Sequence, residues 1–293
     1  MMKVIAPAKL NLFLHITGCR QDHFHLLESL FVFTKWGDEI TISKADTLSL
    51  TVEDTLDSAL HHEPIENNLV FRAALLLKNQ YKVNTGAHIH LTKKIPVAAG
   101  LGGGSSDAAS TLKALNQLWD LQLSNETLAK IGLKLGADIP ACIYQCPAFI
   151  SGIGEHIQPI NLSFLSLPVL LVNPNQPLST QSVFHAYQKN KPTFHASVRD
   201  RLIQHEQNWP AFKKILLENS NHLALSATTL LPSIKTILAT LQEQTGCELA
   251  RMSGSGPTCF AIFSDQQTAD HARKKILTTH PDFWVLLTAI SAS

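Results

Sequence analysis

The sequence predicts an α+β protein of two domains, and three observations support this expectation. Alternation of apolar and polar residues over Lys9–Ile16 and Ala87–Lys93 indicates strands in the first half of the chain. The end of the chain reads as a hairpin, a helix and a closing strand, which is typical of an α+β sandwich. Between the halves, Gln158–Leu167 has no periodic pattern, and 293 residues are enough for two hydrophobic cores. We therefore expect one domain over residues 1–160 and a second over residues 161–293.

The first domain is expected to begin with a half-buried strand and an antiparallel meander. Within Lys9–Ile16, apolar residues alternate with a face that carries Lys9 and Asn11. Trp36-Gly37-Asp38 is typical of a turn, because glycine and aspartate are frequent turn residues. The strands expected after the first are Leu30–Thr34, Glu39–Ser43, Leu48–Val52 and Ala87–Lys93.

Three helices are expected in the first domain, each where an apolar stripe follows a residue that can cap a helix. A carboxylate at Asp107 would lie in the first turn of the second helix, where it suits the helix dipole. The first expected helix is opened by Asn67-Asn68 and runs to about Tyr81. The other two run from Asp107 to Trp119 after a cap at Ser105 or Ser106, and from a cap at Ser124 to Leu135.

The second domain is expected to alternate short strands with helices. Its expected strands are Val169–Val172, Glu248–Met252, Thr258–Phe263 and Phe283–Thr288. Its expected helices begin near Ser179 or Thr180 and then cover Val198–His205, Ala211–Glu218, Pro232–Gln244 and Gln266–Thr278.

The composition is that of an ordinary soluble globular protein. Hydrophobic residues make up 45% and charged residues 16%, and the net charge of +1 gives no basic surplus for nucleic acid or an anionic membrane. No apolar run reaches the length of a transmembrane helix, and polar residues interrupt Met1–Ile16, so we expect no signal peptide there. The five cysteines are scattered and odd in number, which favours reduced thiols. We expect a cytoplasmic protein without a nucleic-acid or membrane partner, and no metal site among its histidines.

A glycine-rich stretch, Pro96–Ala109, stands between an expected strand and an expected helix. It contains Gly100, Gly102, Gly103 and Gly104, followed by a serine pair. Glycines let backbone N–H groups turn toward a ligand, and a helix N-terminus adds free donors and partial positive charge. The stretch therefore predicts a site for a phosphate chain, although a flexible glycine turn before an ordinary helix is the alternative.

Two other phosphate motifs are excluded by the residues themselves. A Walker loop ends in Gly-Lys-Ser/Thr, and no lysine lies between Gly100 and Ser106. A Rossmann fingerprint needs a glycine six positions into the motif, where this chain has Ser105 or Asp107.

Three segments together resemble the motifs of the galactokinase–homoserine kinase–mevalonate kinase (GHMP) superfamily. They are Pro7–Leu12, Pro96–Ala109 and Arg251–Thr258. The resemblance implies a ribosomal-S5-domain-2-like nucleotide-binding domain followed by a ferredoxin-like α+β domain. With Arg20–His25 and Leu135–Pro140 added, the order is most similar to a branch that phosphorylates the 2-hydroxyl of a cytidine diphosphate methylerythritol in isoprenoid precursor synthesis.

The resemblance also implies roles for individual residues. Asp138 would be the base and Lys9 its cationic neighbour, with ATP and Mg²⁺ as cofactors and a monomer or weak homodimer as the assembly. ATP would be bound by Asn68, Pro96, Val97, Ala98, Ala99, Gly100, Leu101, Gly102, Gly103, Gly104, Ser105 and Ser106, with Ser105 or Ser106 also holding Mg²⁺. The cytidine substrate would be bound by Asn11, Phe24, His25, Thr180 and Phe184.

Other interpretations of these residues stay open. Asp138 stands before Pro140, where an aspartate usually caps a helix or forms an Asx-turn, and Phe24 and Phe184 could be core residues. The family usually has glycine where this chain has His23, and histidine tolerates a positive φ less well. The alternative functions are another GHMP kinase, of homoserine or mevalonate type, and a non-catalytic RNA-binding module of the same fold.

Overall fold

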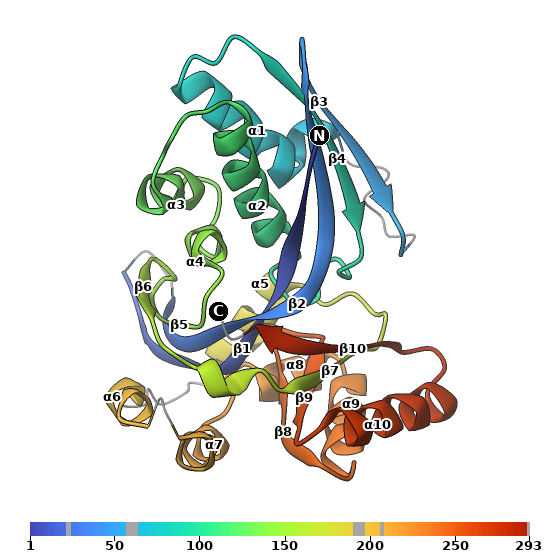
Figure 1. The fold of residues 1–293 in the computed structure, drawn as a ribbon. Coiled ribbons are helices and arrows are strands. Elements are labelled where there is room, and N and C mark those ends of the chain that lie inside the picture. The colour runs from blue at the N-terminus through green and yellow to red at the C-terminus, as the bar shows by residue number, and fades with distance from the viewer. Residues whose placement is uncertain (22–24, 57–63, 190–196, 206–207, 292–293) are drawn as a thin grey trace. The chain divides into compact units, whose positions relative to one another are not determined.

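The computed structural model describes residues 1–21, 25–56, 64–189, 197–205 and 208–291 (Figure 1). These residues form two compact units. Unit 1 comprises Met1–Lys9, Trp36–Val97 and Gly102–Gln145, and unit 2 comprises Leu10–Lys35, Ala98–Leu101 and Cys146–Ser293. The units are therefore not contiguous stretches, and the expected domain boundary between residues 160 and 161 stays a prediction.

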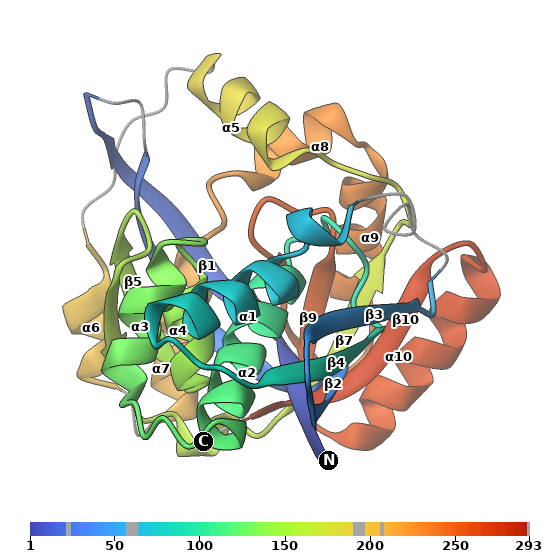
Figure 2. The same ribbon diagram turned by 90° about the horizontal axis from the view of Figure 1, so that it is seen from above.

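Unit 1 is built on a sheet with the order β3 (Leu48–Asp54), β4 (Gly86–Lys93) and the end of β2 (His25–Ala45). β4 runs antiparallel to β2 but parallel to β3, so the expected antiparallel meander is wrong. The helices of this unit are α1 (Leu69–Gln80), α2 (Gly103–Leu118), α3 (Asn125–Leu133) and α4 (Ile139–Tyr144), and a 3₁₀ turn, η2, covers Ile65–Asn67. α2 contacts both α1 and α4 (Figure 2).

Two expectations for the first strands are wrong. Trp36-Gly37-Asp38 is no turn but lies inside β2. A Cβ atom on Gly37 would come within 1.9 Å of the carbonyl oxygen of Ala6, so glycine is required there by a neighbouring backbone. The strand β1 (Met2–Cys19) is not half-buried over Lys9–Ile16, because the residues on both of its faces are buried throughout this range.

The cap expected at Ser124 is confirmed for α3, and α1 begins where expected, with Asn68 as its cap. The side chain of Asn68 accepts a hydrogen bond from the Val70 N–H at 2.9 Å, and Ser124 Oγ accepts one from the Thr127 N–H at 3.2 Å. These side chains satisfy N–H groups that the first turn of a helix leaves without an intrahelical partner. The inner face of α1 is formed by Val70, Ala73, Ala74 and Leu77.

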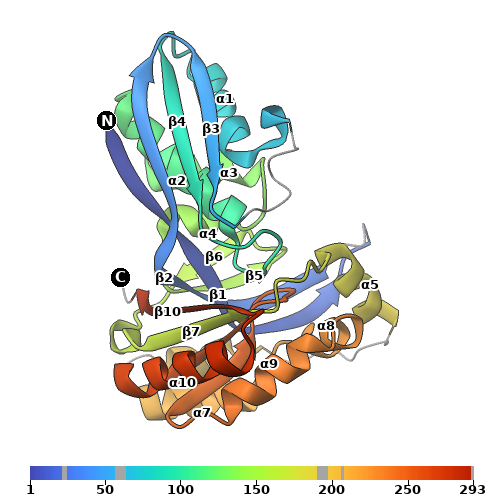
Figure 3. The same cartoon turned by 90° about the vertical axis from the view of Figure 1, so that its right-hand side faces the viewer.

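Unit 2 contains an antiparallel sheet in the order β10 (Trp284–Ser291), β7 (Pro168–Asn173), β9 (Cys259–Phe263) and β8 (Cys247–Met252). With β7 as the first strand, this is the 4-1-3-2 order of a ferredoxin-like fold, as expected. The helices α8 (Ala224–Leu230), α9 (Ser233–Gln242) and α10 (Gln266–Thr279) lie along one face of the sheet (Figure 3), and α8 was not expected from the sequence.

Unit 2 contains further short strands and helices. They are β5 (Ala148–Gly152), β6 (His156–Pro159), η3 (Ser163–Leu165), α5 (Thr180–Lys189), α6 (Arg199–Ile203) and α7 (Trp209–Glu218). β5 pairs with β2 over Leu27–Phe31, and the hydrophobic core between β7, β9 and the helices includes Leu170, Ala261, Phe263 and Ile237. Among the described helices, none combines the length and apolar character needed to cross a membrane.

Candidate functional site

The glycine-rich stretch forms the start of α2, but the helix begins earlier than expected. Gly102 takes a left-handed φ of 65° and precedes the first helical residue, Gly103, and no side chain caps this end. The cap at Ser105 or Ser106 and the position of Asp107 in the first turn are therefore wrong. Because Gly102 can adopt this φ without strain, the chain turns before the serines, which become part of the helix. The first N–H groups of α2 thus have no intrahelical acceptor.

Lys9 and Asp138 lie together in unit 1. Lys9 Nζ is 3.2 Å from Asp138 Oδ2, and the side-chain exposures are 5% and 36%. A Cβ atom on Gly102 would come within 3.0 Å of Lys9 Cε, which places the left-handed residue before α2 directly beside this ion pair. The pair therefore has a buried cation and an accessible carboxylate next to a helix N-terminus.

The side chain of Asp138 does not cap a helix. It occupies the position before α4, yet its side chain forms no capping hydrogen bond. The carboxylate is directed to Lys9 instead. Of the two interpretations left open by the sequence, the structure contradicts the capping role.

A buried cluster of charges, which we did not expect from the sequence, joins β2, β4 and α2. Lys93 Nζ donates to Asp107 Oδ2 at 2.7 Å and also to Asp38, whose other oxygen accepts from the Ile95 N–H at 2.8 Å. Burial raises the pKa of Asp107 to about 8, although Lys93 opposes the shift. Burial alone would lower the pKa of Lys93, but the two carboxylates outweigh it and raise it. The three residues have no motif spacing, so nothing in the sequence signals that they meet.

In unit 2, Ser253 connects the three segments that carry the family resemblance. Ser253 Oγ donates to the Gly100 carbonyl at 2.9 Å and accepts from the Asn11 N–H at 3.3 Å. A Cβ atom on Gly100, which has a φ of 73°, would come within 2.3 Å of the Ser253 carbonyl oxygen. The Asn11 side chain is buried and donates to Ser29 Oγ at 2.9 Å. A single hydroxyl thus joins β1, the glycine-rich stretch and the turn after β8.

Of the expected substrate residues, His25, Thr180 and Phe184 lie on or beside α5, whereas Asn11 lies apart from them on β1. The ring centroids of His25 and Phe184 are 5.0 Å apart, and His25 also lies beside Tyr187. Burial lowers the pKa of His25. Thr180 Oγ1 lies 2.7 Å from Ser255 Oγ. Phe24 lies outside the described residues.

The other expected ATP residues have varied environments. The Asn68 side chain is the cap of α1 described above. Val97 is 46% exposed, whereas Leu101 is buried and the Ala99 carbonyl accepts from the Thr258 N–H at 3.2 Å. Ser106 is buried, and its Oγ has no hydrogen-bond partner among the described residues, whereas Ser105 is half-buried. No group of three or more metal-ligating His, Cys, Asp or Glu side chains occurs in the described part of the chain.

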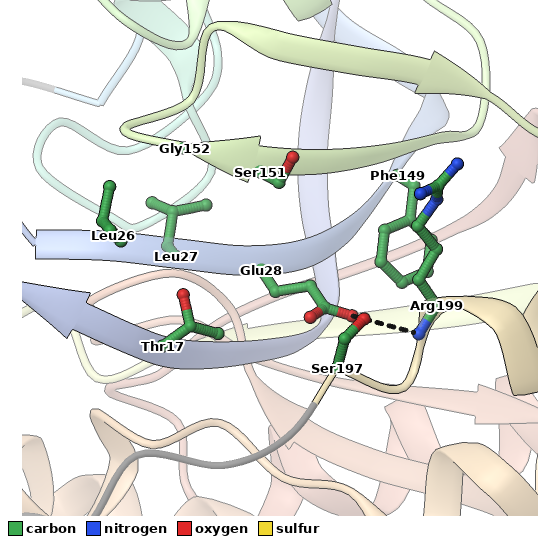
Figure 4. A pocket seen from close by; sticks show the side chains of 9 residues that line it. All are labelled: Thr17, Leu26, Leu27, Glu28, Phe149, Ser151, Gly152, Ser197 and Arg199. Atoms are coloured by element: carbon green, nitrogen blue, oxygen red, sulfur yellow. Dashed lines mark hydrogen bonds between the residues drawn. The ribbon is translucent and has the colours of Figure 1, made fainter.

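Unit 2 also contains a pocket of about 350 Å³ on the side of β2 where α6 lies (Figure 4). Glu28 Oε1 accepts from Ser197 Oγ at 3.0 Å and from the Val198 N–H at 3.1 Å. None of the described residues that line the pocket is among the expected site residues. The lining residues are Thr17, Leu26, Leu27, Glu28, Phe149, Ser151, Gly152, Ser197 and Arg199.

Comparison with known families finds two consecutive matches. Residues 68–146 match the GHMP kinases N terminal domain, and residues 201–282 match the GHMP kinases C terminal model. The first range contains the glycine-rich stretch and Asp138, and the second contains Asn221 and the turn after β8.

Close relatives cover almost the whole chain. A protein of Paramagnetospirillum magneticum is 40% identical over 283 residues, which are 96% of this chain and 95% of the relative. A protein of Ruegeria pomeroyi is 42% identical over 287 residues, which are 97% of each. Both are named 4-diphosphocytidyl-2-C-methyl-D-erythritol kinase. The chain belongs to the 4-diphosphocytidyl-2-C-methyl-D-erythritol kinase family.

Solved structures agree with this family. A crystal structure of 4-(cytidine 5'-diphospho)-2C-methyl-D-erythritol kinase superposes with a TM-score of 0.79 at 26% identity and covers 99% of both chains. A homoserine kinase from Cytophaga hutchinsonii superposes with a TM-score of 0.74 at 18% identity, covering 98% of this chain and 94% of its own, which shows a shared fold. The expected GHMP kinase fold is therefore confirmed, and this member of the 4-diphosphocytidyl-2-C-methyl-D-erythritol kinase family is a small-molecule kinase.

Proposed function

We propose that this protein transfers the γ-phosphoryl group of ATP to the 2-hydroxyl of 4-diphosphocytidyl-2-C-methyl-D-erythritol. The relatives that bear this name align with nearly the full chain. The single observation that carries the chemistry is the Lys9–Asp138 pair beside the start of α2. A kinase of this kind needs a group that accepts the hydroxyl proton, and it needs a positive charge near the transferred phosphoryl group. Asp138 can accept the proton and Lys9 carries the charge.

Asp138 is the proposed general base. Its carboxylate is accessible at 36% exposure, so a hydroxyl of the substrate can reach it, whereas Lys9 is buried at 5%. The hydroxyl proton passes to Asp138 as the substrate oxygen attacks the γ-phosphorus and the bond to the ADP oxygen breaks. The charge of Lys9 offsets the negative charge on the transferred group. Lys9 also orients the carboxylate, because its ammonium holds one of the two oxygens.

ATP is proposed to bind at the glycine-rich stretch. The backbone N–H groups at the start of α2, from Gly103 onward, would receive the phosphates, and the helix dipole favours their charge. Residues 96–102 would form the rest of the phosphate cradle, and Asn68 would contact the adenine. Gly104 is exposed, so its backbone leaves space for a phosphate oxygen where a side chain would intrude.

Mg²⁺ is proposed to accompany ATP, with Ser105 or Ser106 as the protein ligand. A hydroxyl oxygen is a suitable ligand for a hard cation, and Mg²⁺ in kinases is held largely by substrate phosphates and water. The unpartnered Oγ of Ser106 fits this role, because a buried hydroxyl normally has a partner. When bound, the ion would neutralise phosphate charge.

The cytidine substrate is proposed to bind at Asn11, Phe24, His25, Thr180 and Phe184. The aromatic rings of His25 and Phe184 already lie together and can stack on a base. Thr180 adjoins Ser255 in the turn after β8, which supplies hydroxyls for a diphosphate or a polyol. This group of residues would give the specificity that the phosphate cradle lacks.

A coupled assay of ADP release with purified protein tests the proposal. We expect turnover with 4-diphosphocytidyl-2-C-methyl-D-erythritol and none with homoserine or mevalonate. Turnover with homoserine or mevalonate alone would contradict it. We also propose a cytoplasmic enzyme that is a monomer or weak homodimer, in keeping with its five free cysteines, and light scattering across a concentration series tests the assembly.

A further inference from the structure

The segment between α7 and α8 contains a buried asparagine whose contacts reach the turn after β8. Asn221 is 4% exposed and uses both hydrogens of its amide nitrogen. Nδ2 donates to the Met252 carbonyl at 2.8 Å and to the Gly254 carbonyl at 2.7 Å. Its Oδ1 accepts from the Leu223 N–H at 2.9 Å. Every strong hydrogen-bonding position in this side chain except one lone pair is thus occupied by backbone.

The backbone around Asn221 is fixed to β1. The Leu14 N–H donates to the Ser220 carbonyl at 3.2 Å, and the His222 N–H donates to the Leu14 carbonyl at 2.8 Å, which forms an isolated parallel bridge. The His222 ring accepts from the Ile16 N–H at 3.0 Å. Asn221 therefore links the strand β1, which carries Asn11, to the turn that follows β8.

The turn that Asn221 contacts is itself hydrogen-bonded to residues of the proposed site. Ser253 Oγ bonds the Gly100 carbonyl and the Asn11 N–H, and Ser255 Oγ contacts Thr180. Gly254, with a φ of 56°, lies so close that a Cβ atom would come within 3.0 Å of the Gly100 carbonyl oxygen. We expect a shift of this turn to move both Gly100 and Thr180, because each is hydrogen-bonded to a serine of the turn.

We propose that Asn221 is a positioning residue for phosphoryl transfer, which fixes the turn 253–256 and through it Gly100 and Thr180. Asn221 touches neither the proposed phosphate donors nor the base. Its role rests on the proposed function, since the turn matters for catalysis only if Gly100 and Thr180 bind the substrates.

The test replaces the donor while keeping the shape. In Asn221→Asp, a carboxylate oxygen replaces the amide nitrogen that donates to two carbonyl oxygens of the turn. The two hydrogen bonds are lost, and the carboxylate repels the carbonyl oxygens. We expect kcat/KM to fall roughly tenfold or more, because a misplacement of about 1 Å near reacting groups can cost 10²-fold. The loss should shrink as the pH is lowered, since a protonated carboxyl regains one donor, and the ratio of variant to wild-type kcat/KM measures this.

Asn219→Ala is the matched control. Asn219 lies two residues away and donates from Nδ2 to the Ile215 carbonyl at 2.6 Å, a bond of the same kind at the end of α7. This variant should lower the melting temperature yet leave kcat and KM unchanged. Equal kinetic losses in Asn219→Ala and Asn221→Asp, or a pH-independent loss in the latter, would overturn the positioning role.

Hydrogen exchange separates failure of this inference from failure of the proposed function. The N–H groups of Ser253, Gly256 and Thr258 are bonded within the turn or to Ala99, and should exchange faster in Asn221→Asp than in Asn219→Ala. If these N–H groups exchange faster in Asn221→Asp but the wild-type protein shows no kinase activity, only the proposed function is refuted. Wild-type exchange or wild-type kinetics in Asn221→Asp refutes the positioning role. If Asn221→Asp does not fold, Ser253→Ala decides: it removes the bond to Gly100 and must raise KM for ATP.

Discussion

Lys9 Nζ lies 3.2 Å from Asp138 Oδ2, and the lysine is the buried partner of the two. The accessible partner is the one that can meet a substrate hydroxyl. The proposed mechanism needs a buried cation and a carboxylate that a substrate can reach, and Lys9 and Asp138 provide these two groups.

Asp138→Asn is expected to lower kcat by roughly 10²–10⁴, because the amide cannot accept the hydroxyl proton. KM for ATP should change little, since Asp138 is not among the proposed phosphate donors. Steady-state ADP release measures both constants. Asp120→Asn, a change of the same kind at an exposed carboxylate after α2, is the control and should match wild type. Wild-type turnover in Asp138→Asn would remove this residue from the mechanism.

Gly104→Ala separates a structural role of the glycine-rich stretch from a binding role. An added Cβ atom would meet only Leu69 Cδ1, at 3.4 Å, which is ordinary contact. Alanine inside a helix should raise the free energy of unfolding by up to about 1 kcal/mol. If phosphates approach this backbone, the methyl group should nevertheless weaken ATP binding, measured by calorimetry.

Gly136→Ala serves as the control for this substitution. Its Cβ atom would meet Ile139 at 3.6 Å, outside the glycine-rich stretch, so ATP affinity should not change. Unaltered ATP affinity in the more stable Gly104→Ala protein would mean that this part of the stretch is only a turn before a helix.

The buried Asp107 gives stability a pH dependence of definite sign. Burial raises its pKa from 3.8 to about 8, so the folded protein holds this proton more tightly than the unfolded chain does. Asp107→Asn mimics the protonated form. Relative to this variant, wild type should lose stability as the pH rises from about 4 to about 8, by at most about 1.4 kcal/mol per pH unit.

Urea unfolding at pH 5, 7 and 9 measures the effect. Lys93 adds no slope in this window, because its pKa is raised above 10.5. A stability difference between Asp107→Asn and wild type that is the same at pH 5 and pH 9 would contradict the raised pKa.

Features with a cause close by in the sequence were predictable. The caps Asn68 and Ser124 act on N–H groups two or three residues away, and both are in place. The hairpin of β8 and β9, the helix α10 and the strand β10 likewise follow from local periodicity. The resemblance of three motifs then led to the family, because motif order does not depend on knowing the contacts.

Features that depend on distant partners were not predictable. Trp36-Gly37-Asp38 has the composition of a turn, but its glycine is required by the Ala6 carbonyl. The contacts of Asp107 with Lys93 and of Asn221 with Gly254 join segments without any common spacing. The serines at the start of α2 have the right chemistry for a cap, yet the left-handed Gly102 moved the helix start ahead of them.

Base specificity is the last prediction, and it concerns the neighbouring rings of His25 and Phe184, whose centroids are 5.0 Å apart. Phe184→Ala should weaken binding of any pyrimidine substrate by about 1–3 kcal/mol, since stacking tolerates every base. His25→Ala should instead reduce the preference for the cytidine over the uridine substrate, measured as a ratio of kcat/KM values. Burial lowers the pKa of His25, so the ring is neutral at pH 7 and offers one donor and one acceptor, whereas cytosine and uracil exchange donor and acceptor on the facing edge. His185→Ala, an exposed neighbour of Phe184 on α5, is the control and should change neither quantity. If His25→Ala weakens both substrates equally, the ring only stacks and base reading belongs to other groups.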